Sequence, residues 1–499
     1  MEGGNQYREG AVEYDGAADA AGKARYFYYS LNEGIVNCTK DRPDTASATP
    51  VSYGGYWIVG DCENNLLGFK SPDSTPTLPG GLLTPAWKLV ESLGKTTPEP
   101  RFATPVIDAA GTNGMPAGTM YVLWKSETNP LLGAFQLNGA DAPTRLWTFA
   151  LSTILNINVE DGTAIFRTFG EDHAIFWHEG RVYVPSRDFD GMAIFTPSLT
   201  GATYIITPGQ WRDTHRLYGS VAGAGEGGSD AVFLVHGSLY GIQSYDAAGL
   251  QTVGGVFFNA SLDNDDFSHP VQVTFSTGGG TSITCIIATE WDVVGDIFIT
   301  GVDAATLYPC GYGTAIGPWS TRGYYIRAPA FAMPSWVSAP AVLYDGFRTV
   351  FLVYAVNLPD GDRDGNRRSG WRCAIVAVQV DQTGPYTTPP EDVSIIYGAH
   401  CNSAPLIVRE AYGAGNHAIV VGASDGKLYV FPSVGFKATG PILAHDLIGP
   451  TPVAVDGGDN SRLGVAGNYL AASSGGSIAS ILYNGRAQEY WFAIVTGVM

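Results

Sequence analysis

The chain has 499 residues, of which 64 are glycine, 15% are charged and 12% are aromatic, and its formal net charge is −19 at pH 7. This composition excludes a disordered chain, which combines low hydrophobicity with a high density of charge. Lys and Arg form no cluster, which argues against nucleic acid as a partner. No apolar run reaches the length that crosses a bilayer, so we expect no membrane insertion.

The N-terminal segment of the chain differs from the rest of it. Residues 1–24 are expected to form a flexible acidic segment, and residues 25–499 a single domain. The segment lacks the apolar stretch of a signal peptide, so the sequence in this numbering predicts none.

A repeated pattern of short strands fills the chain from about residue 48. Each copy has a small or polar residue, an apolar pair, a turn, an alternating apolar strand, a second turn and a third strand. The mean period is roughly 57 residues, a length typical of repeat architectures. The eight copies begin at Ala48, Ala103, His173, Asp230, Thr284, Ala339, Ala404 and Thr451.

The turns between these strands define the fold class. Asp-Gly, Gly-Gly and Asn-Gly pairs separate strands that alternate apolar with polar residues, which is the signature of antiparallel hairpins. Helical periodicity is nearly absent. We therefore predict an all-β fold, a β-propeller of about eight four-stranded antiparallel blades, with seven blades as the alternative. The terminal strands, RYFYYS from Arg25 and YWFAIVT from Tyr490, are expected to pair and close the ring.

One segment points to a family. Asp141, Thr144 and Trp147 resemble the tryptophan-docking motif of quinoprotein (PQQ-like) propellers, with one residue deleted and Arg145 in place of a glycine. Trp87 and Trp319 lie in looser copies. The resemblance covers the chain from about residue 25 at the level of the repeat, and it implies that the tryptophan packs between neighbouring sheets.

The resemblance does not extend to the chemistry of quinoprotein enzymes. PQQ-dependent alcohol dehydrogenases use an adjacent pair of cysteines over their cofactor, and this sequence has no such pair. We therefore expect no PQQ and no catalytic residues inherited from the family, because a common fold does not fix a function.

Cysteine spacing predicts three local disulfides. The cysteines are separated by 24, 25 and 28 positions within three pairs, and we expect each pair to tie neighbouring strands of one unit. The alternative is six buried thiols. The predicted pairs are Cys38 with Cys62, Cys285 with Cys310, and Cys373 with Cys401.

Disulfides indicate an oxidising location, which is extracellular, on a cell surface or on a virion surface. Two sequons, at Asn37 and Asn259, mark candidate glycosylation sites that fit such a location.

The strongest chemical signal is a possible calcium loop at the tip of a long hairpin. Three carboxylates at alternate positions followed by a glycine reproduce the first half of an EF-hand loop, and Ca²⁺ prefers oxygen ligands. The later acidic ligands of that loop are missing, and the alternative is a solvated polar turn. A bound Ca²⁺ would be structural. The candidate ligands are Asp360, Asp362, Asp364 and Asn366.

A second motif matches a catalytic pattern but lacks the structural context that the pattern requires. Residues 422–426 match GxSxG, the pattern of a nucleophile elbow, which requires a strand, a strained turn and a helix. The flanking residues form two strands, so we interpret Asp425-Gly426 as a hairpin turn.

Three functions remain open at this level. The leading hypothesis is a non-enzymatic structural or binding propeller with protein partners or self-assembly, for example in a coat, sheath or filament. The alternatives are a carbohydrate-active lyase or hydrolase, or a degenerate quinoprotein, acting in the central channel, and a glycan-binding lectin. Convergent titratable side chains in the channel would favour an enzyme.

Overall fold

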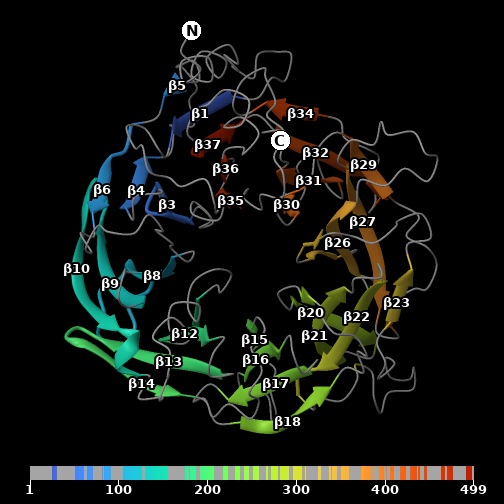
Figure 1. Cartoon of the computed structure of the whole chain (residues 1–499), viewed down its shortest axis with the longest axis horizontal. Helices are drawn as coiled ribbons and strands as arrows, with labels where there is room; N and C mark the ends of the chain where they lie inside the picture. The colour runs from blue at the N-terminus through green and yellow to red at the C-terminus, as the bar shows by residue number, and fades with distance from the viewer. Residues whose placement is uncertain are drawn as a thin grey trace.

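The computed structural model consists almost entirely of strands arranged in a ring (Figure 1). Short stretches between and beside the strands are described as well. The described residues are 25–30, 51–60, 65–70, 81–82, 84–90, 105–125, 130–154, 175–178, 180–186, 191–206, 217–222, 231–236, 241–246, 251–257, 266–267, 271–278, 281–291, 296–305, 310, 324–327, 336–338, 340–344, 350–358, 372–381, 384–385, 393–397, 401, 405–408, 416–422, 427–434, 437–438, 443–446, 462–466, 469–475 and 490–496.

The described strands form eight sheets, which we number as blades 1 to 8 in chain order. In blades 1 to 4 four strands pair antiparallel in chain order, with the last strand at the periphery of the ring (Figure 1). The strands are β2 (Val51–Tyr53), β3 (Tyr56–Gly60), β4 (Asn65–Lys70) and β6 (Trp87–Val90) in blade 1; β7 (Val106–Asp108), β8 (Thr119–Lys125), β9 (Pro130–Asn138) and β10 (Asp141–Ala150) in blade 2; β11 (Phe176–His178), β12 (Arg181–Ser186), β13 (Gly191–Ser198) and β14 (Gly201–Ile206) in blade 3; and β15 (Leu217–Ala222), β16 (Ala231–His236), β17 (Gly241–Asp246) and β18 (Gln251–Phe257) in blade 4.

Blades 5 to 7 keep four strand positions, but some positions are filled by two short strands that pair with the same neighbour. The strands are β19 (Asp266–Phe267), β20 (Val271–Gly278), β21 (Thr281–Trp291), β22 (Asp296–Asp303) and β23 (Tyr324–Arg327) in blade 5; β24 (Trp336–Val337), β25 (Ala341–Tyr344), β26 (Val350–Leu358), β27 (Arg372–Asp381), β28 (Gly384–Pro385) and β29 (Val393–Tyr397) in blade 6; and β30 (Leu406–Val408), β31 (Asn416–Gly422), β32 (Lys427–Val434), β33 (Lys437–Ala438) and β34 (Leu443–Asp446) in blade 7.

Blade 8 joins the two ends of the chain, as the sequence predicts. It contains β35 (Arg462–Ala466), β36 (Tyr469–Gly475) and β37 (Tyr490–Thr496), and β37 pairs antiparallel with β1 (Arg25–Ser30) over six residues. A short parallel strand, β5 (Gly81–Leu82), comes from the connection inside blade 1 and pairs with β1. Because β2 also contacts β35, the first and last blades meet and the ring is closed.

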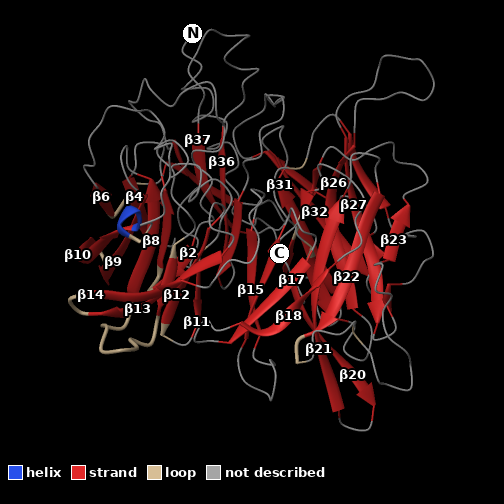
Figure 2. Cartoon of the chain, turned by 60° about the horizontal axis from the view of Figure 1, so that its bottom comes forward, coloured by secondary structure: helices blue, strands red, loops and turns tan. Residues whose placement is uncertain are grey.

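The apolar core is divided into layers between neighbouring blades. One layer joins blades 2 and 3 and contains Tyr121, Trp147 and Phe195, all buried. A second layer, between blades 5 and 6, is built mainly from Val and Ile. In Figure 2 nearly all of the described elements are strands, and the described residues include a single short helix, the 3₁₀ turn η2 (Leu151–Thr153).

The prediction of an all-β propeller with a terminal closure is therefore confirmed. The domain boundary at residue 24 falls in a stretch outside the described residues, so it stays a prediction.

Candidate functional site

The predicted calcium loop cannot be placed. Asp360, Asp362, Asp364 and Asn366 lie outside the described residues, between two strands that pair up to Leu358 and Arg372. Cys38, Cys62 and the sequon residues Asn37 and Asn259 also lie outside them. These sites stay predictions. Within the described ranges, no three His, Cys, Asp or Glu side chains lie close enough to hold a metal ion together.

The GxSxG segment follows the hairpin interpretation. Gly422 ends β31 and pairs with Leu428 of β32, so residues 423–426 connect two antiparallel strands. A nucleophile elbow would need a helix in the place of β32.

Among the described residues, no helix is long and apolar enough to cross a membrane.

Two of the three predicted disulfides are present. Cys285 bonds Cys310 with a Cα–Cα distance of 6.0 Å, and Cys373 bonds Cys401 with a distance of 5.5 Å. The first pair lies within blade 5. The second differs from the expectation of a bond within one unit, because Cys401 lies after the last strand of blade 6, in the connection to blade 7.

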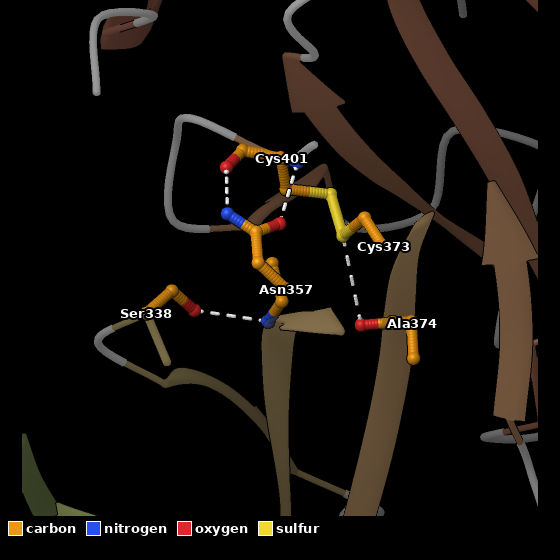
Figure 3. The surroundings of a disulfide bond; sticks show 6 residues. Ser338, Asn357, Cys373, Ala374 and Cys401 are labelled. Atoms are coloured by element: carbon orange, nitrogen blue, oxygen red, sulfur yellow. Dashed lines mark hydrogen bonds between the residues drawn. A yellow bond between two sulfur atoms is a disulfide. The ribbon is translucent and has the colours of Figure 1, made fainter. Parts of the chain in front are cut away.

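A buried asparagine reinforces that second disulfide (Figure 3). The Asn357 side chain accepts a hydrogen bond from the Cys401 N–H and donates one to the Cys401 carbonyl, both at 2.8 Å. Ala355 lies two residues before Asn357 on β26, and its N–H donates a hydrogen bond to the Ser338 hydroxyl. The connection between blades 6 and 7 is therefore fixed by one covalent bond and by paired amide contacts.

Asp108 has a comparable structural role in blade 2. Its carboxylate accepts hydrogen bonds from the N–H groups of Ala110, Gly111 and Thr112 and from the Thr112 hydroxyl, at 2.7–3.2 Å. These four hydrogen bonds hold the loop after β7 in a fixed conformation.

That loop reaches across to blade 3. The Asn113 side chain donates a hydrogen bond to the Gly180 carbonyl in the turn between β11 and β12. Gly180 has φ +78°, and a Cβ there would lie 2.7 Å from the Asn113 amide nitrogen. The left-handed backbone conformation favours glycine at this position, and a larger residue would also displace the Asn113 side chain.

Trp147 docks as the family resemblance implies. Its ring is buried between blades 2 and 3, and its indole N–H donates a 2.9 Å hydrogen bond to the Ser198 carbonyl at the end of β13. Thr144, from the same motif, accepts a hydrogen bond from Asn138 in the preceding strand. The motif is structural and sets the position of the turn that joins β13 to β14.

Tyr121 is the one described tyrosine of this seam with a buried hydroxyl that has no partner. The ring stacks on Trp177 of blade 3 at a centroid distance of 5.0 Å, and no hydrogen bond to the hydroxyl exists among the described residues. Burial, with a further contribution from the Asp108 carboxylate, raises the pKa of this hydroxyl. Tyr354 differs, because its buried hydroxyl pairs with Thr289 across blades 5 and 6 at 2.8 Å.

The buried polar side chains thus serve the scaffold. The five that the described residues contain each hydrogen-bond backbone or a neighbouring side chain. They are Asp108, Thr119, Thr289, Ser338 and Asn357.

The surface has one feature of another kind. Among the described residues, the large apolar side chains that are exposed all lie on the hairpin of β13 and β14: Leu199 at 55%, Tyr204 at 39% and Ile205 at 46%. This hairpin lies at the outer rim of the ring (Figure 1). These side chains lie along the edge of blade 3, where a partner could contact them together, and so we take the β13–β14 hairpin as the candidate functional site.

Sequence reasoning missed this site. The repeat as it appears in the sequence ends at Phe195, short of β14. The signal that would have located it is the run GATYII from Gly201, a strand without charge or proline.

No protein-family model matches the chain, and no curated protein matches it. Among solved structures the chain is similar to the quinohemoprotein alcohol dehydrogenase from Comamonas testosteroni, at 10% identity and a TM-score of 0.47, covering 94% of this chain and 76% of that one. It is also similar to BamB from Moraxella catarrhalis, at 12% identity and a TM-score of 0.45, covering 91% and 97%. A third structure is Sqt1 from Saccharomyces cerevisiae, at 9% identity and a TM-score of 0.45, covering 94% and 97%.

Proposed function

We propose that the chain is a non-enzymatic binding propeller that holds a protein partner on the β13–β14 hairpin, as part of a larger assembly. The single observation that carries this proposal is the gathering of Leu199, Tyr204 and Ile205 on one hairpin. A few residues supply most of the binding energy in protein interfaces, and tyrosine is enriched among them.

The hairpin is also well supported from beneath. Tyr204 packs edge-on against Phe149 of blade 2, at a centroid distance of 5.4 Å, and lies beside Phe195. Trp147 fixes the turn through Ser198. A rigid hairpin loses little conformational entropy on binding, which favours recognition.

The two disulfides support an oxidising location, and we propose that the assembly is extracellular or lies on a cell or virion surface. Disulfide bonds persist mainly in such compartments.

The test is the native particle mass of the protein in its source, measured by mass photometry. We expect particles heavier than the 52.9 kDa chain, and we expect Ile205→Glu to return them to the mass of the single chain. The matched control is Thr148→Glu, because Thr148 is exposed on the outer strand β10 of blade 2. A single-chain mass for the unaltered protein, or assemblies that Ile205→Glu leaves intact, would contradict the proposal.

A further inference from the structure

The outer strands of blades 2 and 3 differ in how they present their free edge. In β10 the register against β9 is interrupted twice, and the strand carries Pro143, Asp141 and Arg145. Charges, prolines and bulges are the devices by which natural edge strands avoid pairing with another chain. The edge of β10 is therefore protected.

The edge of β14 has none of these devices. All six residues of β14 pair with β13 in continuous register, and the strand has no charged residue and no proline. It stands last in the order of its sheet, so no described strand pairs with its outer side. Such an edge is a template for a further strand.

Pro197 indicates which backbone groups face outward. Pro197 pairs with Ala202, and since proline has no N–H, we expect this pair to be one of the non-hydrogen-bonded pairs of the ladder. Pairs alternate along an antiparallel ladder, so the N–H and carbonyl groups of Ala202 and Tyr204 point away from β13. Those of Thr203 point toward it.

The side chains flank this row of backbone groups on both faces. Tyr204 and Ile205 are neighbours in the strand and therefore lie on opposite faces of the sheet. A strand added to the edge would contact both of them, and Tyr204 already rests on Phe149.

The charge of the chain selects the partner. The chain carries −19 at pH 7, so a second copy would meet long-range repulsion, whereas a segment flanked by Lys or Arg would be attracted. Because β14 itself has no charge, the paired part of the partner is apolar.

We propose that β14 binds an extended apolar segment of a different protein, flanked by basic residues, which adds to blade 3 as a further strand. Addition of a strand to a sheet edge is a known recognition mode, in which main-chain hydrogen bonds give affinity. This inference rests on the proposed function, because it names the partner of the same hairpin.

The probe is the fluorescein-labelled peptide KKVTVTVKK, with EEVTVTVEE as its acidic counterpart, and binding is measured by fluorescence anisotropy. We expect the basic peptide to bind at least tenfold more tightly than the acidic one. Ala202→Pro removes an outward N–H and leaves the bonds to β13, so it should weaken binding at least tenfold. Thr148→Pro on the protected strand β10 is the matched control and should leave binding unchanged.

Hydrogen exchange supplies a second readout that does not depend on a proline variant. Binding of the basic peptide should slow exchange in the segment from Leu199 to Ile206. Ile205→Lys keeps the backbone and adds a repelling charge, so it should remove both the binding and the protection.

Three results would overturn the inference. They are no binding of the basic peptide at 1 mM, equal binding by Ala202→Pro at an unchanged melting temperature, and a purified chain that dimerises through β14. The last result would leave the proposed function in place, with a second copy as the partner. Loss of the proposed function would instead show as a native particle mass that the hairpin variants do not change.

Discussion

The seam between blades 2 and 3 and the region from blade 5 to blade 7 achieve the same docking of sheets by different means. The first uses large aromatic rings, Tyr121, Trp147 and Trp177, and hydrogen bonds from loop to loop. The second uses mainly Val and Ile side chains, one disulfide within blade 5, and one disulfide from blade 6 to the connection that leads to blade 7. Val and Ile bury less apolar area per side chain than large aromatic rings, and in the second region disulfides add covalent restraint to this packing.

Among the variants that compare the two regions, truncation of Trp147 should lower the unfolding free energy most. Trp147→Ala removes a buried ring and the hydrogen bond to Ser198, and we expect a loss of about 3–5 kcal/mol in unfolding free energy. Denaturant titration measures this loss. Trp147→Phe keeps most of the apolar volume and should cost less than half as much. A loss below about 1 kcal/mol for Trp147→Ala would show that the aromatic seam is not what holds blade 3.

Removing the Cys373–Cys401 bond tests the other side of the comparison. The double substitution Cys373→Ser and Cys401→Ser releases a loop of 28 residues, and the chain-entropy account gives about 3.5 kcal/mol. Hydrogen exchange, read over separate peptides, should show faster exchange in β26–β31 and unchanged exchange in β8–β13. Equal acceleration in both regions would mean that the two seams are not independent.

The two buried tyrosines give a smaller and more selective test. Tyr354→Phe leaves the Thr289 hydroxyl buried without its partner, so it should cost about 1–3 kcal/mol. Tyr121→Phe removes a buried hydroxyl that makes no described hydrogen bond, so it should be neutral or slightly stabilising. Thermal unfolding of the two variants measures these losses of stability. Equal losses for Tyr354→Phe and Tyr121→Phe would contradict the prediction.

Alkaline pH should lower the stability of both seams. Burial raises the pKa of Tyr121 and Tyr354 above the ordinary value of 10.0. The native state then holds these protons more tightly than the unfolded state, so their contribution is fully present below pH 10 and is lost as pH rises above it. The slope is about 1.4 kcal/mol per pH unit for each tyrosine. Each Phe variant should reduce the fall in melting temperature between pH 10 and 11. An unchanged fall would show that Tyr121 and Tyr354 do not cause the loss of stability.

The sequence predicts well what depends on local pattern. Turn residues and alternating strands define the propeller, Trp147 identifies a docking position, and cysteine spacing locates two disulfides. The sequence predicts poorly the features that depend on the position of a strand in its sheet or on contacts between residues far apart in the chain. The exposure of Tyr204 and Ile205 is a property of the edge of blade 3, and the contact of Cys401 with Asn357 joins residues 44 positions apart. Neither leaves a periodic signal in the sequence.

The pairing of β1 with β37 has a consequence for how the protein is made. The partner of β1 is synthesised long after β1 itself, and at roughly 5–20 residues per second the wait is tens of seconds. Until then β1 lacks the neighbour to which it is joined over six residues. A chain that stops before Tyr490 lacks β37 and cannot close the ring through β1. Its unpaired β1 is a physical difference by which cellular quality control can distinguish an unfinished chain from a complete one.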